Sequence, residues 1–324
     1  MQNMEINFFN ETKKLKEEIG KDIAASFEEI ENRQIKEILM QRQLTSRYIK
    51  GITSYYLHRG LGGKFSHNKL INLATAIEIY STSMVLIDNL IDKHTKRNGR
   101  TTCLKEYGPE MTGLASLYAS NVGLLRLSPY LQNFFKITGI NGYDAVGKAI
   151  TGAVAMDIEH PTKPNQILEE ITKVNGITLG FPLGLVASTA INDKMKIFGI
   201  IRYGIDTGIA FGLYEEIRDF FGEHGKGEAS EMKSGRIPYF IADLISVDPK
   251  FKCSDYIGRN ATSYRLKKLL KLLKKKKVLE KTKNLIKNHL NYGKNNLQRN
   301  LRENEFKILD SLRITIEDSL EKLI

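Results

Sequence analysis

The sequence predicts an all-α protein, folded as a single helical bundle of about ten or more helices in one domain, residues 1–324. Three observations favour this fold class. Leucine, lysine, glutamate and isoleucine are abundant, whereas the 324 residues include only 7 prolines and no tryptophan. Apolar residues recur at helical spacing along most of the chain. No alternation of apolar and polar residues is long enough to supply the strands of a sheet.

The predicted helices follow one another with short polar breaks. Residues 10–49 have the spacing of one or two amphipathic helices, and residues 58–69 form a glycine-rich loop. The next helix, 70–93, is apolar on nearly all sides, which indicates a central position, and Asn98 and Gly99 mark the turn after it. Further helices are expected at 113–127, 145–158, 167–173, 179–191, 194–221, 239–245, 265–292 and 303–323, with a polar loop at 220–238.

Positive charge is concentrated late in the chain. The formal net charge is +12, and much of the excess lies in the run RLKKLLKLLKKKKVLEKTKNLIK, Arg265–Lys287. This balance allows attraction to nucleic acid, acidic membranes or anionic small substrates. For the run itself we favour a solvated helix of the bundle, because its leucines share one face. Peripheral membrane contact is the next interpretation, and no nucleic-acid partner is expected because no recognition motif accompanies the charge.

The cysteine count and the apolar stretches indicate the cellular compartment. Two cysteines provide no disulfide framework, which suits a reducing compartment. The first residues lack the long apolar core of a signal peptide. The most apolar stretch, 176–191, is short and interrupted by glycine and proline. We therefore expect a cytoplasmic protein without a membrane span.

Two acidic clusters lie on apolar helices. Asp88 and Asp92 are four residues apart, and Glu215, Asp219 and Glu223 repeat at the same interval, so each set shares one helix face. Like charges at this spacing repel each other, and unpaired charge on an apolar helix is costly. Acidic pairs also arise by chance on solvated faces. If the two helices face each other, the carboxylates converge on one cavity and suit Mg²⁺, which usually shares a substrate phosphate.

These segments resemble the trans-prenyl diphosphate synthases of the class I isoprenoid synthase superfamily. That family carries a DDxxD motif and an RRG turn, which here read DNLID at 88–92 and RNG at 97–99. Its second acidic motif resembles EEIRDFFG at 215–222. Its GKRxR loop resembles GKFSH at 63–67, and its mid-chain lysine is matched by Lys173. The likeness covers about residues 61–240.

The resemblance implies a helical bundle around a central cavity, an allylic prenyl diphosphate substrate and three Mg²⁺ ions. It also implies a homodimer. The metals would remove the diphosphate and leave an allylic carbocation. The metal ligands implied are Asp88, Asp92, Glu215, Asp219 and Glu223, and the diphosphate contacts implied are Lys64, Arg97 and Lys173.

The departures from the family pattern concern cations that would hold isopentenyl diphosphate. Phe65, His67 and Asn98 replace arginines, Ser81 replaces a histidine, and only Lys64 remains. Lysine could not simply replace the lost bidentate contacts. The allylic half is retained apart from Glu215, which replaces an aspartate. Gly212 stands where the family has glutamine, and Val174 follows Lys173 where it has threonine.

This pattern favours ionisation of an allylic diphosphate without isopentenyl diphosphate, as in a terpene synthase. One alternative is a prenyltransferase, either a chain-elongating synthase or an enzyme with another acceptor. A non-catalytic partner subunit of a synthase is the third possibility, and the retained acids argue against it. A membrane-binding or nucleic-acid-binding module would follow from the basic run.

Helix geometry also predicts the substrate length. Met84 and Tyr80 lie one and two turns before Asp88 on the same face, roughly 6 and 12 Å from it. In the resembling synthases, bulky residues at this level stop the chain. We expect Tyr80 and Met84, with the small Ser83 beside them, to form a floor that favours C15 substrates and admits C20 if Met84 moves aside.

Overall fold

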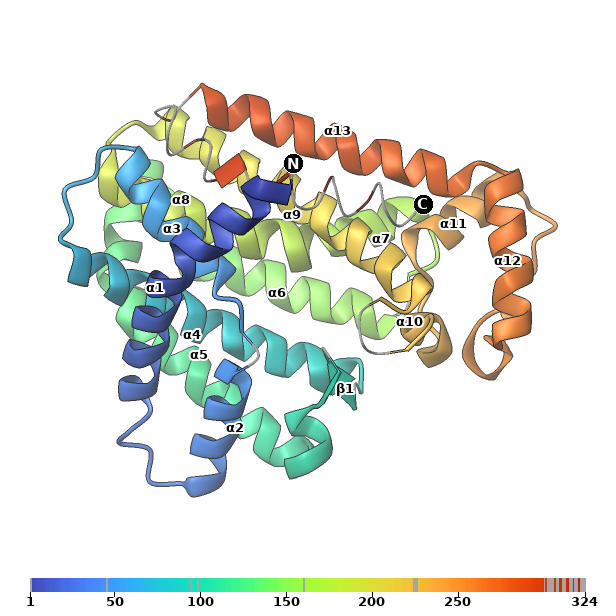
Figure 1. Ribbon diagram of the computed structural model, residues 1–324, viewed down its shortest axis with the longest axis horizontal. Coiled ribbons are helices and arrows are strands. Elements are labelled where there is room, and N and C mark those ends of the chain that lie inside the picture. Colours follow the sequence, from blue (N-terminus) through green and yellow to red (C-terminus); the bar gives the residue numbers. More distant parts are fainter. Residues whose placement is uncertain are drawn as a thin grey trace.

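The computed structural model is almost entirely helical, which confirms the predicted all-α class (Figure 1). It describes residues 2–44, 46–93, 95–97, 99–159, 161–223 and 227–299, and beyond these 301, 306, 309–310, 313–314, 317 and 320. For residues 2–11, 44, 97, 153 and 157 only the backbone is described.

The helices and their bounds, in chain order, are as follows. The first half contains α1 (Gln2–Ser26), α2 (Arg33–Leu44), α3 (Ile49–Gly60), α4 (His67–Ile91), α5 (Cys103–Thr138) and α6 (Gly142–Glu159). The second half contains α7 (Pro164–Ile171), the π-helix η1 (Thr172–Ile177), α8 (Thr178–Ala190), α9 (Lys194–Phe221), α10 (Ser230–Ser234), α11 (Tyr239–Val247), the short 3₁₀ turns η2 (Cys253–Asp255) and η3 (Gly258–Asn260), α12 (Ser263–Lys275) and α13 (Val278–Gln298).

Several stretches differ from the sequence expectation, and the predicted polar loop 220–238 contains the short helix α10. The predicted helix 265–292 is two helices, because Lys277 adopts a left-handed backbone with φ 55° between α12 and α13. The predicted helix 113–127 is the middle of α5, which is kinked at Gly108 with φ 81°. After α4 the chain forms one minimal hairpin, β1 (Lys96–Arg97) and β2 (Arg100–Thr101). Most of the predicted helix 303–323 lies outside the described residues.

The bounds of α9 agree with the prediction, and its caps explain why. Asp193 accepts hydrogen bonds from the backbone N–H groups of Met195 and Lys196, both at 3.1 Å, and so begins the helix. Gly222 ends it in the left-handed conformation, φ 76°, which costs glycine little. The helix therefore delivers Glu215 and Asp219 at a defined position in its last two turns.

The apolar helix α4 lies inside the bundle. It packs against α1, α3 and α5, while α9 packs against α8 and α13 (Figure 1). α4 has the length and hydropathy of a membrane span, but 72% of its most apolar window is buried, as in the core helix of a bundle. Its buried side chains therefore fix the orientation of its remaining face, which carries Asp88.

Candidate active site

A cavity of about 350 Å³ opens between α4, α6, η1, α8, α9 and the segment that joins α2 to α3. α4 contributes one face of seven side chains, and α9 contributes Thr207, Gly208 and Phe211 from the opposite side. These two helices thus both line one cavity, which is the condition for their acidic motifs to act on one ligand. The α4 lining residues are Glu78, Ser81, Met84, Val85, Ile87, Asp88 and Ile91. Glu215 lies one turn beyond Phe211 on the same face of α9.

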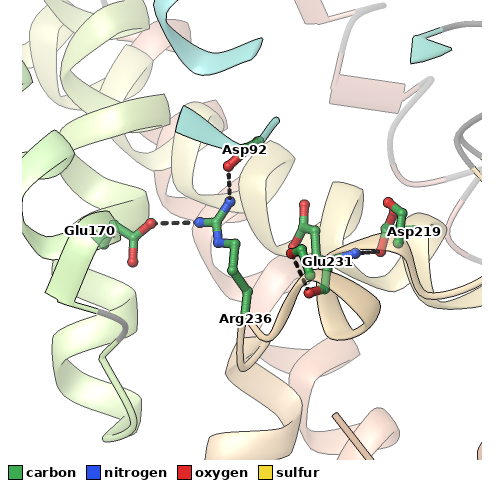
Figure 2. A network of polar contacts seen from close by, with 7 residues as sticks. Asp92, Glu170, Asp219, Glu231 and Arg236 are labelled. Carbon is green, nitrogen blue, oxygen red and sulfur yellow. Dashed lines mark hydrogen bonds and ion pairs between the residues drawn. The ribbon is translucent and has the colours of Figure 1, made fainter. Parts of the chain in front are cut away.

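The acidic motif of α4 is divided between the cavity and an ion pair. Asp88 lines the cavity. The side chain of Asp92 is 5% exposed, and its Oδ1 accepts from Nη1 of Arg236 at 3.0 Å. The other nitrogen of that guanidinium, Nη2, donates to Oε1 of Glu170 at 2.7 Å, so Arg236 bridges α4 and α7 (Figure 2). The sequence analysis missed Arg236 and Glu170, because only the fold brings residues so distant in sequence together.

The acidic motif of α9 is engaged by its own surroundings. Oε1 of Glu215 accepts from Nη1 of Arg218 at 2.6 Å. Asp219 is buried; its Oδ1 accepts from the Ser230 hydroxyl and its Oδ2 from the Glu231 backbone N–H at 3.0 Å. Asp219 therefore fixes the turn that begins α10. Glu223 is exposed, and only its backbone carbonyl meets the Arg218 guanidinium, at 3.1 Å.

Glu216 is a buried carboxyl group next to the acidic motif of α9. Its Oε2 accepts from the backbone N–H of Tyr239 at 2.8 Å. Burial raises the pKa of Glu216 well above its usual value, and the nearby Glu231 raises it further. Figure 2 shows Glu231 between Asp219 and Arg236, so one arginine serves a cluster of several acids. The raised pKa favours the neutral form of Glu216, which lessens the repulsion within this cluster.

The donor set fits Mg²⁺ in its chemistry, because carboxylate oxygens are the ligands this ion prefers. Among the residues that the structure describes, no three histidine, cysteine, aspartate or glutamate side chains are close enough together to hold an ion. The bonds from Arg236 to Asp92 and from Arg218 to Glu215 explain this arrangement. These carboxylates would have to exchange their partners before they could hold a metal.

Lys173 does not line the cavity, although its neighbours Val174 and Asn175 do. Its Nζ pairs with Oε1 of Glu169 at 2.7 Å and lies 3.4 Å from the sulfur of Met156 on α6. The predicted diphosphate contact would require Lys173 to leave this pair. The side chain of Arg97 lies outside the described residues; its backbone pairs with Arg100 in the hairpin.

Gly212 explains one departure from the family pattern. A Cβ at this position would lie 2.6 Å from Cγ2 of Ile171 and 2.7 Å from the Asn175 amide nitrogen. The end of α7 and the π-helix η1 therefore approach α9 too closely for the glutamine of the family. This close packing also places Val174 and Asn175 in the cavity wall.

Three cations line the same cavity, and the sequence analysis missed them: Arg42, Arg47 and Lys50. Arg47 is exposed and forms no ion pair within the described part of the chain. Burial lowers the pKa of Lys50, and Arg42 lowers it further, while Glu78 opposes the shift. Lys50 lies in the first turn of α3, where the helix dipole disfavours a cation. That unfavourable placement was the available sequence signal for an anion site.

Glu78 balances part of this positive charge. Its Oε1 accepts from the backbone N–H of Gly51 at 2.6 Å. Burial raises the pKa of Glu78, and the Gly51 hydrogen bond, Lys50 and Arg42 oppose the shift. The cavity thus carries three cations and one acid on the side of α3, and Asp88 about 15 Å from Glu78 along α4.

The glycine-rich loop must be reassigned. It precedes His67, the first residue of α4, whereas Asp88 lies near the last turn, about 30 Å away by helix rise. Lys64, which the resemblance assigns to isopentenyl diphosphate, is exposed at this far end and does not line the cavity. Phe65 stacks on His58 with ring centroids 4.6 Å apart, and His67 Nε2 lies 2.7 Å from Oε2 of Glu18. The cavity therefore gives no support to the prediction that Lys64 binds substrate.

A second cavity, of about 270 Å³, lies between α4, α5, α6 and α8. Tyr80 and Met84 line it, and Met84 and Ile150 line the larger cavity as well. Burial raises the pKa of Tyr80 to about 12, so it stays a neutral phenol. Ser83 lines neither cavity; it is fully buried, and its hydroxyl donates to the Tyr80 carbonyl at 2.7 Å. The predicted role of Ser83 in the cavity wall is thus corrected.

Comparison with known proteins supports the resemblance proposed from the acidic motifs. No protein-family model matches the sequence. A short chain isoprenyl diphosphate synthase of Methanocaldococcus jannaschii is 22% identical over 217 residues, which cover 64% of this chain and 66% of that protein. The aligned part thus spans slightly less than two thirds of that relative.

Solved structures agree over nearly the whole chain. The geranylgeranyl pyrophosphate synthetase of Pyrococcus horikoshii has a TM-score of 0.83 at 15% identity, covering 96% of this chain and 98% of that one. The heptaprenyl diphosphate synthase of Staphylococcus aureus has a TM-score of 0.79 at 16% identity, with the same coverage. The fold is therefore the all-α isoprenoid synthase fold, and the predicted resemblance to trans-prenyl diphosphate synthases is confirmed.

Proposed function

We propose that the protein is a Mg²⁺-dependent prenyl diphosphate synthase, which joins an allylic prenyl diphosphate to isopentenyl diphosphate. The observation that carries the proposal is the larger cavity, which combines Asp88 with the cations Arg42, Arg47 and Lys50. Two diphosphate groups need two anion sites: one built from metal-binding acids and one from side-chain cations. The names of the similar proteins support the same activity.

The terpene synthase interpretation has lost its main support. It depended on missing cations in the loop at 63–67, and that loop lies at the far end of α4 from Asp88. The cations that line the cavity come from α2 and from the residues around the start of α3 instead. A non-catalytic partner subunit would not need an open cavity with charges at both ends.

The chain's own groups have separate tasks in this reaction. Asp88, Asp92, Glu215 and Asp219 would hold Mg²⁺, with three ions proposed, and the metal would neutralise the leaving diphosphate. Arg42, Arg47 and Lys50 bind the diphosphate of the second substrate and orient its double bond toward the allylic carbon. Ile87, Val154 and Leu179 line the cavity and exclude the water that would quench a carbocation.

The second cavity would receive the growing chain. Its lining is apolar apart from hydroxyl groups, and Met84 separates it from the larger cavity. Because methionine is flexible, it can yield to a longer chain, whereas Tyr80 forms a firmer wall beyond it. We retain the preference for C15 substrates, with C20 admitted when Met84 moves. We further propose a cytoplasmic homodimer.

Incubation of the purified chain with Mg²⁺ and allylic diphosphates of several lengths tests the proposal. Release of inorganic diphosphate should require both isopentenyl diphosphate and the metal, and it should stop when the metal is chelated. Equal release without isopentenyl diphosphate would favour the terpene synthase interpretation.

A further inference from the structure

Helix α12 carries a strongly basic surface that the proposed reaction does not use. Seven exposed lysines form the α12 basic face, which consists of Lys267, Lys268, Lys271, Lys274, Lys275, Lys276 and Lys277. The sequence contains no aspartate or glutamate between Asp255 and Glu280. The positive charge of this segment is therefore not diluted by neighbours along the chain.

The basic face lies opposite a buried apolar face. Leu266, Leu269 and Leu273 are buried in the hydrophobic core, so α12 is fixed to the bundle. With 3.6 residues per turn, the five lysines of the helix proper cover an arc of about 120° on its other side. Figure 1 shows α12 at one end of the molecule, next to the start of α13. The lysines thus form one outward surface.

Few of these charges are neutralised inside the protein. Lys276 pairs with Asp248 at 3.1 Å, and Lys268 lies over the ring of Tyr264, 4.8 Å from its centroid. The other five lysines have no ion pair within the part of the chain that the structure describes. By contrast, the exposed Lys148 on α6 pairs with Asp144, one turn away, at 2.8 Å. The α12 basic face is therefore a surface of uncompensated positive charge.

We propose that the α12 basic face docks on an anionic membrane surface. Clusters of four to eight basic residues on one face suit acidic lipid headgroups, and each contributes roughly fivefold to membrane partitioning. The leucines of α12 are committed to the core, so docking is electrostatic and reversible rather than an insertion into the bilayer.

The side chains of this face favour a lipid surface over nucleic acid. Reading of base edges usually combines arginine or lysine with asparagine and glutamine, and binding of single strands relies on several exposed aromatic rings. The face contains only lysines, and the nearby Tyr264, although exposed, is a single ring over which Lys268 lies. Nζ groups are compact charges without the planar geometry that pairs with a base. Such a face matches a diffuse layer of negative charge.

Cosedimentation of the full chain with lipid vesicles tests the proposal, without substrate or Mg²⁺, so its outcome does not depend on catalysis. The native chain should bind phosphatidylcholine vesicles that contain about 30 mol% phosphatidylglycerol and should not bind pure phosphatidylcholine. Binding should be lost when the salt concentration is raised from about 0.1 M to about 0.5 M. Lys267, Lys271, Lys274 and Lys275 replaced together by glutamine should weaken binding more than tenfold.

A matched variant separates the local face from net charge. Lys13, Lys21, Lys105 and Lys196 are exposed lysines on other elements, and their replacement by glutamine removes the same charge. That variant should bind anionic vesicles within about twofold of the native chain, because contact is local at this salt concentration. Equal loss in both variants, or no binding by the native chain, would overturn the proposal. Tighter binding to a single-stranded RNA oligonucleotide than to the vesicles would also overturn it.

Discussion

The two cavities share Met84 and Ile150 yet differ in the chemistry of their walls. The larger cavity is lined by five charged residues, Arg42, Arg47, Lys50, Glu78 and Asp88, whereas the described residues that line the smaller one include no charged side chain. Diphosphate groups belong with the first set and a hydrocarbon chain with the second, because burying an unpaired charge among apolar groups is costly. One helix, α4, thus contributes residues to both cavities, and Met84 lies at the boundary between them.

Substitution at the acidic end of the larger cavity should reduce activity more than any other change proposed here. Asp88→Asn keeps the shape of the side chain but removes its charge, so catalysed diphosphate release should fall by at least about 100-fold. The helical content measured by circular dichroism should stay the same. Glu29→Gln is the control, because Glu29 is exposed and lies outside the site, and it should retain activity. Full activity of Asp88→Asn would remove this residue from the site.

The cations of the larger cavity should bind isopentenyl diphosphate and not the allylic substrate. Replacing Arg47 and Lys50 by glutamine should raise the KM for isopentenyl diphosphate roughly 10- to 100-fold, because each charge-assisted contact is lost. The KM for the allylic substrate should change little. Lys64→Gln removes a cation at the far end of α4 and should leave both values unchanged. If only Lys64→Gln raised the KM for isopentenyl diphosphate, the loop at 63–67 would belong to the binding site after all.

Arg236 should compete with a divalent metal for Asp92. Arg236→Gln leaves Asp92 and Glu170 without their shared guanidinium, which should lower the melting temperature in the absence of metal. Added Mn²⁺ should then bind about tenfold more tightly than to the native chain, measured by isothermal titration calorimetry. Arg259→Gln, an exposed site on η3, is the control. Weaker Mn²⁺ binding by Arg236→Gln would contradict this competition.

The apolar cavity should set product length. Tyr80→Ala enlarges it and should raise the ratio of longer to shorter products by up to about tenfold, as determined by chromatography of the products. Ser83→Ala should not change the ratio, since Ser83 lines neither cavity. A larger shift from Ser83→Ala than from Tyr80→Ala would show that the chain follows another path.

The two ends of α4 show which features could be predicted from the sequence and which could not. The helical fold and the bounds of α9 follow from local patterns, which short segments carry. The loop at 63–67 was misplaced because a motif match ignores helix length, although 21 residues of rise separate His67 from Asp88. The partners of Asp92 and Asp219 are set by tertiary contacts with residues 229–236, which spacing along the chain does not reveal.

The fate of radiolabelled isopentenyl diphosphate tests the central claim most directly. In the presence of Mg²⁺ and a C15 allylic diphosphate, the label should appear in a prenyl diphosphate one five-carbon unit longer, and the Arg47 and Lys50 double variant should lose this incorporation. The claim would be contradicted if the label stayed in isopentenyl diphosphate while the allylic substrate was converted to a hydrocarbon or an alcohol.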